Sequence, residues 1–541
     1  MDAPSSVRAY LLFGLYLAVA ITIAIALSLA LHARSSLSDS AQLSPNSTGQ
    51  PGESKYAVII VVDGARPDYF NMVPMPHLQE MMNRGITYTQ AFVGQELANT
   101  PPSHTTIGTG MEPRHHGVQG FLWEDPRTHT VLNPTSIGAV QNGELEAVIR
   151  RHHVPTLAGQ IKKANPDAKI VSVSAHKCYA ADAMGTPSAD YILCALIFHN
   201  RWVAQAVGNH RPPSGAINNP RWDVPSPPRS AGFGPAVQQW RAGTENSWTM
   251  RYALWAFHRI HYPRVLMINL SETDVLGHFA SSDQTARLLM RQFDQLLGQL
   301  VSAYRQAGLL DQTNFVITAD HGMSRISRHL PYEMLSRAVD MAGATAVHIE
   351  HDTSAVIDIE EQEKAQQVAV NVAQLAGNLV DATFYKVFDH GRWLYRAASV
   401  QNNVPSSLQA AYRKLADTVA AESGPDVVAI FAPHVSTRQL VVYGYPWRAG
   451  HLGPQWDDQH IPLIIAGPAI KAGETSTHPA RLVDIAPTIE HLLGAPSGKV
   501  DGIVLEDALR SPSSQGLDRQ RARASQLSPV VQALQLRSDQ G

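Results

Sequence analysis

The chain has 541 residues, of which 44% are hydrophobic and 16% are charged, and its formal net charge is −3. A chain of this length can bury a large core and suggests two or more domains. The near-neutral charge argues against a nucleic-acid polymer as partner, because proteins that bind nucleic acids carry a basic excess. The charge does not exclude small anionic substrates, because bound metal ions can supply positive charge locally.

The first 54 residues predict a membrane anchor and a tether. Residues 9–31 carry no charged side chain and are long enough to cross a bilayer, which needs about 20 apolar residues. The exit sequence LHAR is a poor cleavage site, which favours an uncleaved anchor over a signal peptide. Residues 35–54 have the composition of a flexible tether. We therefore expect residues 1–34 to anchor the chain in a membrane and the body to lie outside the cytoplasm.

Strand-like and helix-like patterns alternate through residues 55–323 and again through 445–510. This alternation predicts an α/β catalytic core with a mainly parallel central sheet flanked by helices. Residues 200–249, rich in Pro, Gly, Asn and Trp, predict an irregular insertion. The expected strands are 57–62, 86–93, 170–173, 265–270, 315–317 and 461–466, and the expected helices include 76–84, 156–163 and 284–306.

A second α/β pattern interrupts this core at residues 324–444. It comprises extended segments at 346–359, 383–395 and 427–431 and helices at 360–375 and 406–421. We interpret residues 324–444 as a smaller cap lobe inserted into the main fold. The tail, residues 511–541, is polar with scattered Arg, a composition typical of disorder.

Two cysteines, Cys178 and Cys194, lie close together in the sequence. They would form one disulfide in an oxidising compartment. Two buried free thiols are an equal alternative, because free cysteine packs as a small apolar side chain. The sequence contains no CxxC pair and no Cys/His zinc-finger spacing.

Aspartate and histidine side chains stand where several predicted strands end or begin. The carboxyl ends of parallel strands meet at one edge of a sheet, and ligands collect there. Asp and His together suit zinc, and three carboxylates with three imidazoles are what two adjacent divalent ions need. Each residue taken singly is more often a turn Asp or a hydrogen-bonded His. The candidate ligands are Asp63, Asp274, His278, Asp320, His321 and His451.

Thr100 is followed by two prolines, a pattern typical of a helix N-terminus. The free N–H groups and the positive dipole end of such a helix suit a phosphate group. Thr100 can therefore cap this helix, attack phosphorus, or do both in different states. Ser103 is the rival nucleophile in the same segment.

In their order along the chain, these motifs resemble the alkaline phosphatase superfamily, in particular its type I phosphodiesterase/nucleotide pyrophosphatase branch. The resemblance covers most of residues 56–496 and implies an alkaline-phosphatase-like fold. It also implies one metal ion on Asp274, His278 and His451, and a second on Asp63, Asp320 and His321 with Thr100 as nucleophilic ligand. The strings that carry it are VVDGARPD, NTPPSHTTIGTG, EPRHHGV, SETDVLGH, TADHGM and GHLGPQWDDQHIPLIIAGP.

Two positions depart from the pattern of this superfamily. Branch members usually place an Asn shortly after the HG(I/V) motif to bind a phosphoryl oxygen, and Phe121 stands there. Phosphomonoesterases often carry a Lys-Asp-Arg string that grips the terminal phosphate. Here Lys177 is present and a candidate phosphate ligand, with a solvated lysine as the alternative, but Tyr179 replaces the Arg. No Cys-x-Pro-x-Arg sulfatase string occurs.

The sequence therefore predicts a membrane-anchored hydrolase of phosphoric esters with two divalent metal ions and a threonine nucleophile. A phosphodiesterase or nucleotide pyrophosphatase acting on a small phosphate ester is the first reading, with Zn2+ or else Mn2+. The alternatives are a phosphomonoesterase, an envelope transferase that moves a phospho-alcohol head group, and a surface binding module that retains the fold. The sequence leaves the natural substrate and the oligomeric state open.

Overall fold

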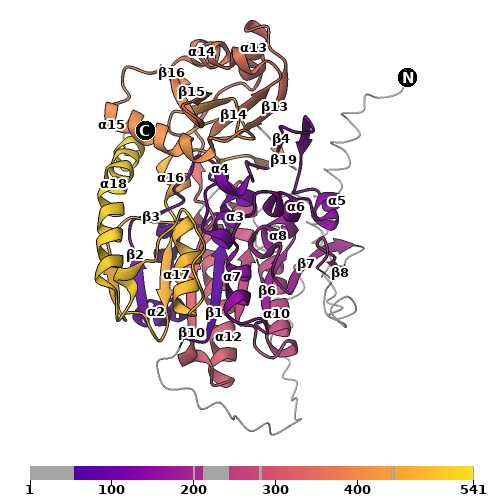
Figure 1. Cartoon of the computed structure of the whole chain (residues 1–541), viewed down its shortest axis with the longest axis vertical. Coiled ribbons are helices and arrows are strands. Elements are labelled where there is room, and N and C mark those ends of the chain that lie inside the picture. Colours follow the sequence, from indigo (N-terminus) through magenta and orange to yellow (C-terminus); the bar gives the residue numbers. More distant parts are fainter. Residues whose placement is uncertain are drawn as a thin grey trace.

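The computed structural model describes residues 54–198, 201–210, 243–279, 283–439, 441–442 and 445–539 (Figure 1). The predicted membrane anchor and nearly all of the predicted tether lie outside these residues. None of the helices in the described ranges combines the length and the apolar character that a bilayer span requires.

The largest sheet among the described residues has nine strands. Five consecutive strands, β10, β1, β9, β6 and β7, are parallel, whereas β22 and β8 run antiparallel to their neighbours. The predicted mainly parallel central sheet is therefore confirmed. In spatial order the strands are β23 (Glu474–Ser476), β2 (Gly85–Tyr88), β22 (Leu463–Ala466), β10 (Thr313–Thr318), β1 (Tyr56–Val62), β9 (Val265–Leu270), β6 (Ile170–Ala175), β7 (Tyr191–Phe198) and β8 (Arg201–Gln205).

The central strands are buried on both faces because helices pack over the sheet. All six residues of β9 are buried, as are all six of β10, which explains their unbroken apolar runs. Helix α10 packs on β6 and β9, and α8 packs on β6 and β7 beside α3. The helices of this core lobe are α2 (Pro76–Asn83), α3 (Thr100–Thr109), α4 (Pro113–His116), α5 (Ile137–Asn142), α6 (Glu144–Arg151), α7 (Leu157–Ala164), α8 (Cys178–Gly185), α10 (Thr244–Arg259), α11 (Glu272–Gly277), α12 (Asp283–Gln306), α16 (Trp456–Gln459) and α17 (Ile485–Leu492).

The predicted irregular insertion at 200–249 is wrong at both of its ends. Strand β8 pairs with β7 and extends the central sheet, and helix α10 already begins at Thr244. Trp248 and Tyr252 are buried one turn apart in α10. The Pro- and Gly-rich residues beside them masked this helical spacing in the sequence. Residues 211–242 lie outside the described ranges.

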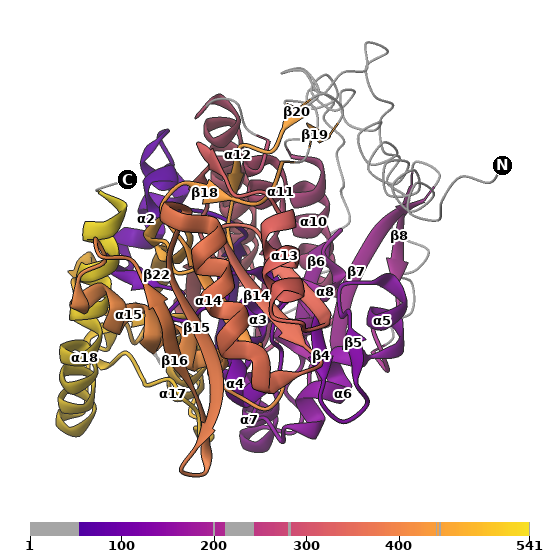
Figure 2. The ribbon, with the colours of Figure 1, turned by 90° about the horizontal axis from the view of Figure 1, so that it is seen from above.

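A second sheet of five strands forms the cap lobe, and all its strand pairs are antiparallel. Figures 1 and 2 place this lobe over the end of the core lobe where α3 and α4 lie. The segment predicted as one extended run, 346–359, is a hairpin. In spatial order the strands are β13 (Ala346–His351), β14 (Ser354–Ile359), β17 (Val427–Phe431), β15 (Val380–Asp389) and β16 (Arg392–Val400).

The alternation of side chains in β17 explains why helices cover both faces of the cap sheet. Val428 and Ile430 pack toward α15 (Ser406–Ala416) and α18 (Ser514–Ser538). Their neighbours Val427, Ala429 and Phe431 pack toward α13 (Glu333–Met341) and α14 (Ala365–Ala376). Period-two alternation sends successive side chains to opposite faces of a sheet.

Helix α18 corrects the prediction of a disordered tail. It begins after Ser513, whose hydroxyl accepts a hydrogen bond from Gly516 N, and it packs against α15. Leu527, Val531 and Leu534 recur at helical spacing and are buried in the cap lobe. The polar composition of the tail therefore hid one narrow apolar stripe, which is enough to dock a helix.

Short strands complete the description. Their pairs are β3 (Ala91–Phe92) with β24 (Ala480–Arg481), β4 (Trp123–Asp125) with β5 (Thr130–Leu132), β11 (Ser324–Arg325) with β21 (Ala449–Gly450), β12 (Arg328–His329) with β18 (Val435–Ser436), and β19 (Val441–Val442) with β20 (Tyr445–Pro446). Of the two alternatives for the cysteines, the structure contains the disulfide. It joins Cys178 at the start of α8 to Cys194 in β7.

Candidate active site

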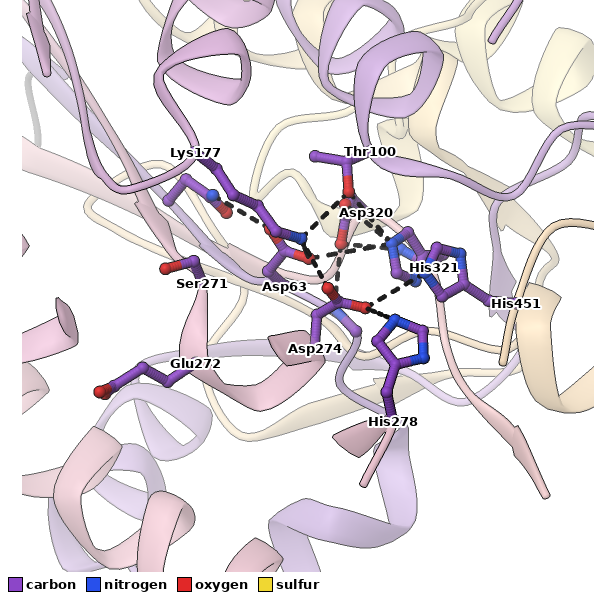
Figure 3. A network of polar contacts seen from close by, with 12 residues as sticks. Asp63, Thr100, Lys177, Ser271, Glu272, Asp274, His278, Asp320, His321 and His451 are labelled. Atoms are coloured by element: carbon purple, nitrogen blue, oxygen red, sulfur yellow. Dashed lines mark hydrogen bonds and ion pairs between the residues drawn. The ribbon is translucent and has the colours of Figure 1, made fainter. Parts of the chain in front are cut away.

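The predicted ligands meet at one edge of the central sheet (Figure 3). Asp63 follows β1, Asp320 and His321 follow β10, and Asp274 lies in α11, directly after β9. His451 follows β21 and precedes β22 in the chain. Because β22 is antiparallel to β10, the chain enters it from the edge at which the parallel strands end. We call the six residues the Asp/His cluster: Asp63, Asp274, His278, Asp320, His321 and His451.

Close backbone approach brings the carboxylates of this cluster together. Gly64 has φ of +71°, and a Cβ atom there would lie 2.9 Å from Cα of Asp274. Glycine is therefore required for β1 and α11 to come this close. The Gly64 amide donates to Asp320 Oδ1 at 3.1 Å, and Asn269 Nδ2 donates to Asp63 Oδ2 at 3.1 Å.

The three histidines of the cluster share one orientation. Each Nδ1 lies 2.8–2.9 Å from a backbone carbonyl oxygen, to which it donates in the neutral ring. This bond fixes the tautomer and leaves the lone pair of Nε2 for a metal ion. The pairs are His278 with Ala449, His321 with Gly322, and His451 with Ala98.

The Nε2 atoms face carboxylate oxygens that accept no hydrogen bond from the described residues. Asp274 Oδ1 lies 3.2 Å from Nε2 of both His278 and His451, and Asp320 Oδ2 lies 3.3 Å from His321 Nε2. Two buried acceptors facing each other are stable only with a positive charge between them. These residues therefore fit divalent metal ions.

The ligand atoms form two groups, and within each group the atoms lie within 4.8 Å of one another. One is Asp63, Asp320 and His321, which is the set that the resemblance implies. The other joins Asp274 and His451 to His321, where the resemblance implies His278. His278 still lies beside this group, because it shares Asp274 Oδ1 with His451. All six predicted ligands are thus brought together around two neighbouring points.

Burial disfavours the negative charge of the carboxylates in this cluster. It raises the pKa of Asp63, and Asp320 raises it further. Burial would also raise the pKa of Asp274, yet Lys177 and His278 hold it well below its usual range. For His451, burial lowers the pKa but Asp274 outweighs it and raises the value to about 9. The cluster therefore favours positive charge at these points.

Thr100 is the first residue of α3, and Asn99 is the N-cap. The prediction that Thr100 caps the helix is thus wrong, because the backbone turns helical one residue earlier. Thr100 Oγ1 lies 3.4 Å from His321 Nε2 and accepts from Lys177 Nζ at 3.2 Å. Ser103, the rival nucleophile, accepts instead from Gln95 Nε2 at 3.3 Å. The structure therefore places Thr100, and not Ser103, against the Asp/His cluster.

Lys177 is buried, with 5% of its surface exposed, so the alternative of a solvated lysine is wrong. Its ammonium donates to Asp63 Oδ1 at 2.7 Å and to Asp274 Oδ2 at 2.8 Å, in addition to Thr100. Burial lowers the pKa of Lys177, but Asp274 and Asp63 raise it well above its usual value. Figure 3 shows the side chain reaching between the two carboxylates toward Thr100.

Sequence reasoning missed two residues that support the cluster. His104 is fully buried on α3, and its Nδ1 lies 2.9 Å from Thr100 O and 3.4 Å from Asp320 Oδ2. Its position four residues after Thr100, on the same helix face, was the available signal. Asn269 was detectable as the polar residue in the apolar strand VLMINL.

Two features define the class of protein: a mainly parallel sheet, and Asp and His side chains that lie around a buried threonine at one edge of it. The fold is that of the alkaline phosphatase superfamily, and the matching family and relatives are hydrolases named as phosphodiesterases, pyrophosphatases, phosphatases and a triphosphatase. The family model described as type I phosphodiesterase / nucleotide pyrophosphatase matches residues 57–439. The chain therefore belongs to that family, as the motifs predicted.

Individual relatives are distant. Alkaline phosphatase PhoK of Sphingomonas sp. is 25% identical over 334 residues, which are 53% of this chain and 59% of PhoK. Alkaline phosphatase PhoD of Zymomonas mobilis is 23% identical over 501 residues, covering 79% of this chain and 83% of PhoD. The bis(5'-adenosyl)-triphosphatase enpp4 of Mus musculus is 24% identical, covering 52% of this chain and 51% of enpp4. The chain thus spans little more than half of PhoK and of enpp4.

Solved structures confirm the fold. Wild-type alkaline phosphatase PafA superposes with a TM-score of 0.63 at 18% identity, covering 84% of this chain and 99% of PafA. Murine ectonucleotide pyrophosphatase/phosphodiesterase 5, in an inactive variant bound to AMP, gives a TM-score of 0.55 at 18% identity over 83% of this chain and 97% of that protein.

Proposed function

We propose that this protein hydrolyses phosphate diesters by nucleophilic attack of Thr100 on phosphorus. The observation that carries the proposal is the convergence of three carboxylates and three imidazoles on two points beside the Thr100 hydroxyl. Family membership supports the same reaction class. A surface binding module would not need a buried nucleophile, a buried lysine and a full ligand set at one point.

Two divalent ions, with zinc first and manganese second, suit the mixed Asp and His donors. One would be held by Asp63, Asp320 and His321, and the other by Asp274 and His451 with His278. Such ions supply Lewis acidity that lowers the pKa of a hydroxyl and neutralises the charge of a phosphoryl group. All six donors are at most 7% exposed, so bulk water competes little for these positions.

The reaction proceeds in two displacements. Thr100 gives its hydroxyl proton to solvent and its Oγ1 forms a bond to phosphorus, while the bond from phosphorus to the leaving alkoxide breaks and the alkoxide takes a proton from solvent. Water then attacks the phosphothreonine, releases the phosphate monoester and returns the hydroxyl proton to Thr100. Ionised at neutral pH, the Lys177 ammonium stabilises negative charge on Thr100 Oγ1 and on the phosphoryl oxygens.

Two separate variants, one at Thr100 and one at Ser103, test whether Thr100 is the nucleophile. Thr100→Ala removes the attacking oxygen, and we expect the rate on bis(p-nitrophenyl) phosphate to fall at least about 10³-fold. Ser103→Ala is the matched control, because Ser103 lies on the same helix and bonds to Gln95. It should retain at least half of the rate. A Thr100→Ala variant as fast as the parent would overturn the proposal.

We also propose that the body is held at a membrane surface, outside the cytoplasm. The support is the uncharged run at residues 9–31 and the Ser- and Pro-rich segment that follows it. Membrane fractionation of the full chain and of a chain that starts at residue 54 tests this location. Equal partition of both chains into the soluble fraction would contradict it.

A further inference from the structure

A tryptophan outside the Asp/His cluster stacks on one of the histidines in it. Trp447 lies between β20 and β21, and its ring centroid is 3.8 Å from that of His278, with 25° between the two planes. Phe279 contacts the same indole edge-to-face, at 5.2 Å and 87°. Trp447 is half-buried, whereas Phe279 is buried. Aromatic pairs in these two arrangements are stabilised beyond their buried area, so the indole is held in place over His278.

The ring contacts continue through the other two histidines of the cluster. The ring centroids of His278 and His451 lie 5.2 Å apart at 31°, and those of His451 and His321 lie 3.5 Å apart at 15°. Trp447 is therefore the first of four rings in successive contact, and the three imidazoles are drawn in Figure 3. Among the histidines of the cluster, the contact of Trp447 is with His278.

The segment that carries Trp447 fixes His278 in two further ways. Ala449 O accepts a hydrogen bond from His278 Nδ1 at 2.8 Å, and Arg448 N donates to His278 O at 2.8 Å. The same segment continues to His451, two residues after Ala449. The indole covers a face of the imidazole while Ala449 holds its edge, so Nε2 of His278 is kept pointing in one direction.

Stacking on an indole favours the metal-bound form of an imidazole over its free form. An imidazole that binds a divalent ion takes on part of the positive charge of the ion, and the face of an indole attracts positive charge. Replacing groups that orient a ligating histidine typically lowers metal affinity about 10- to 100-fold. Trp447 cannot ligate an ion itself, because an indole N–H is only a donor.

We propose that Trp447 is a positioning residue that raises the affinity of the chain for the divalent ion held by Asp274, His278 and His451. This inference rests on the two-metal site of the proposed function. Trp447 acts through His278, whose ring it stacks on and whose orientation it maintains.

Zinc binding to the metal-free, full-length chain tests the proposal without any substrate. Competition with a chromogenic chelator gives the two dissociation constants. Trp447→Leu keeps an apolar side chain but removes the ring, and one of the two constants should rise at least about tenfold. Trp447→Phe keeps a ring face and should leave that constant within about threefold of the parent value. The other constant should not change in either variant.

Trp456→Leu is the matched control, because it removes a tryptophan that stacks on a histidine outside the Asp/His cluster. The centroids of Trp456 and His460 lie 4.4 Å apart at 21°, and Trp456 is buried. This variant should keep both zinc dissociation constants at the parent values. An equal loss of zinc affinity in Trp456→Leu and Trp447→Leu would trace the effect to general destabilisation and overturn the proposal.

Tryptophan fluorescence provides a second readout that does not require Trp447→Leu to fold. The difference between the emission spectra of the parent and of Trp447→Phe isolates the emission of Trp447 among the nine tryptophans. We expect zinc to change this difference spectrum, because the imidazole in contact with the indole becomes metal-bound. A difference spectrum that is the same with and without zinc overturns the proposal.

The failures of the two proposals look different. A parent chain that binds no zinc contradicts the two-metal site of the proposed function. A parent chain that binds two zinc ions, with the same two dissociation constants in Trp447→Leu, overturns the role of Trp447 alone. Excess zinc should restore the rate of Trp447→Leu on bis(p-nitrophenyl) phosphate, and a rate loss that excess zinc does not restore would also overturn that role.

Discussion

The core lobe and the cap lobe bury polar side chains for different purposes. In the core lobe, the buried Asp63, Asp274 and Asp320 crowd together at the ends of parallel strands, where their charge can act on a ligand. In the cap lobe, Glu350 and Ser354 reach instead across the boundary to Asn99 and Glu96 of the core lobe. The core lobe therefore supplies the reactive groups, and the cap lobe sets the surroundings of those groups.

A substitution at Asp274 tests most strongly whether the core lobe supplies the reactive groups. Asp274→Asn removes a charge that faces Lys177, His278 and His451. We expect kcat/KM to fall about 10³-fold, roughly 4 kcal/mol of transition-state stabilisation. Bound metal, measured by atomic emission, should drop from two ions per chain to one.

Asp283→Asn is the control for this change, because Asp283 is exposed at the start of α12 and pairs with Arg325. It should leave both the rate and the metal content at the parent values. If Asp274→Asn kept two ions and the full rate, the core lobe would not be the source of the chemistry.

The stability of the cap lobe is tested on α18. Leu534 is 2% exposed in the cap core, whereas Leu536 on the same helix is 57% exposed. Leu534→Ala should lower the free energy of unfolding by about 3 kcal/mol, because it leaves a cavity. Leu536→Ala should change it by less than about 0.5 kcal/mol. Urea unfolding measures both, and equal effects would contradict the docking of α18.

A buried carboxyl at the boundary between the lobes predicts a pH dependence. Burial raises the pKa of Glu96 to about 8 from its ordinary 4.5. Between these values the folded protein holds a proton that the unfolded chain releases, so the free energy of unfolding falls as the pH rises. We expect a fall of about 1 kcal/mol per pH unit from pH 5 to pH 8.

Glu96→Gln keeps the shape of this side chain and removes its titration. The slope of stability against pH, from denaturant unfolding at each pH, should therefore be smaller in the variant than in the parent. Identical slopes in the two proteins would show that Glu96 does not retain a proton in the folded state.

The smallest effect is expected at Glu350, the cap residue that accepts a hydrogen bond from Asn99, directly before Thr100 in the chain. The two carboxylate oxygens of Glu350 accept hydrogen bonds from Asn99, Phe121 and Leu122. Glu350→Gln leaves only one oxygen to accept them. We expect kcat/KM on bis(p-nitrophenyl) phosphate to fall about tenfold, because one set of hydrogen bonds is lost. Glu363→Gln, at an exposed position of the same lobe, should have no effect, and an equal loss there would contradict the positioning role of Glu350.

The sequence was sufficient for the active edge of the core lobe, because the topology of a parallel sheet determines which strand ends meet there. Once β1, β9 and β10 are recognised as parallel strands, the residues that follow them must lie at one edge, whatever the details of packing. Asp63, Asp274 and Asp320 could therefore be grouped without coordinates. The mainly parallel sheet followed from the same apolar runs.

The remaining features depend on contacts that no local pattern encodes. The hydrogen bond between Asn99 and Glu350 joins residues 251 positions apart, and the contact of Phe121 with Tyr179 joins the loop before β4 to the first turn of α8. Asn99 and Thr100 are both good helix caps, so only the backbone decides between them. In the tail, composition outweighed the spacing of a few leucines, and α18 was missed.

Anomalous X-ray diffraction from crystals grown with zinc, collected above and below the zinc edge, would locate the metal ions relative to Thr100. We expect two peaks about 3.5–4 Å apart, one beside Asp63, Asp320 and His321 and the other beside Asp274 and His451. Thr100 Oγ1 should lie against the first. A single peak elsewhere in the molecule, or a Thr100 side chain turned away from both peaks, would contradict the account.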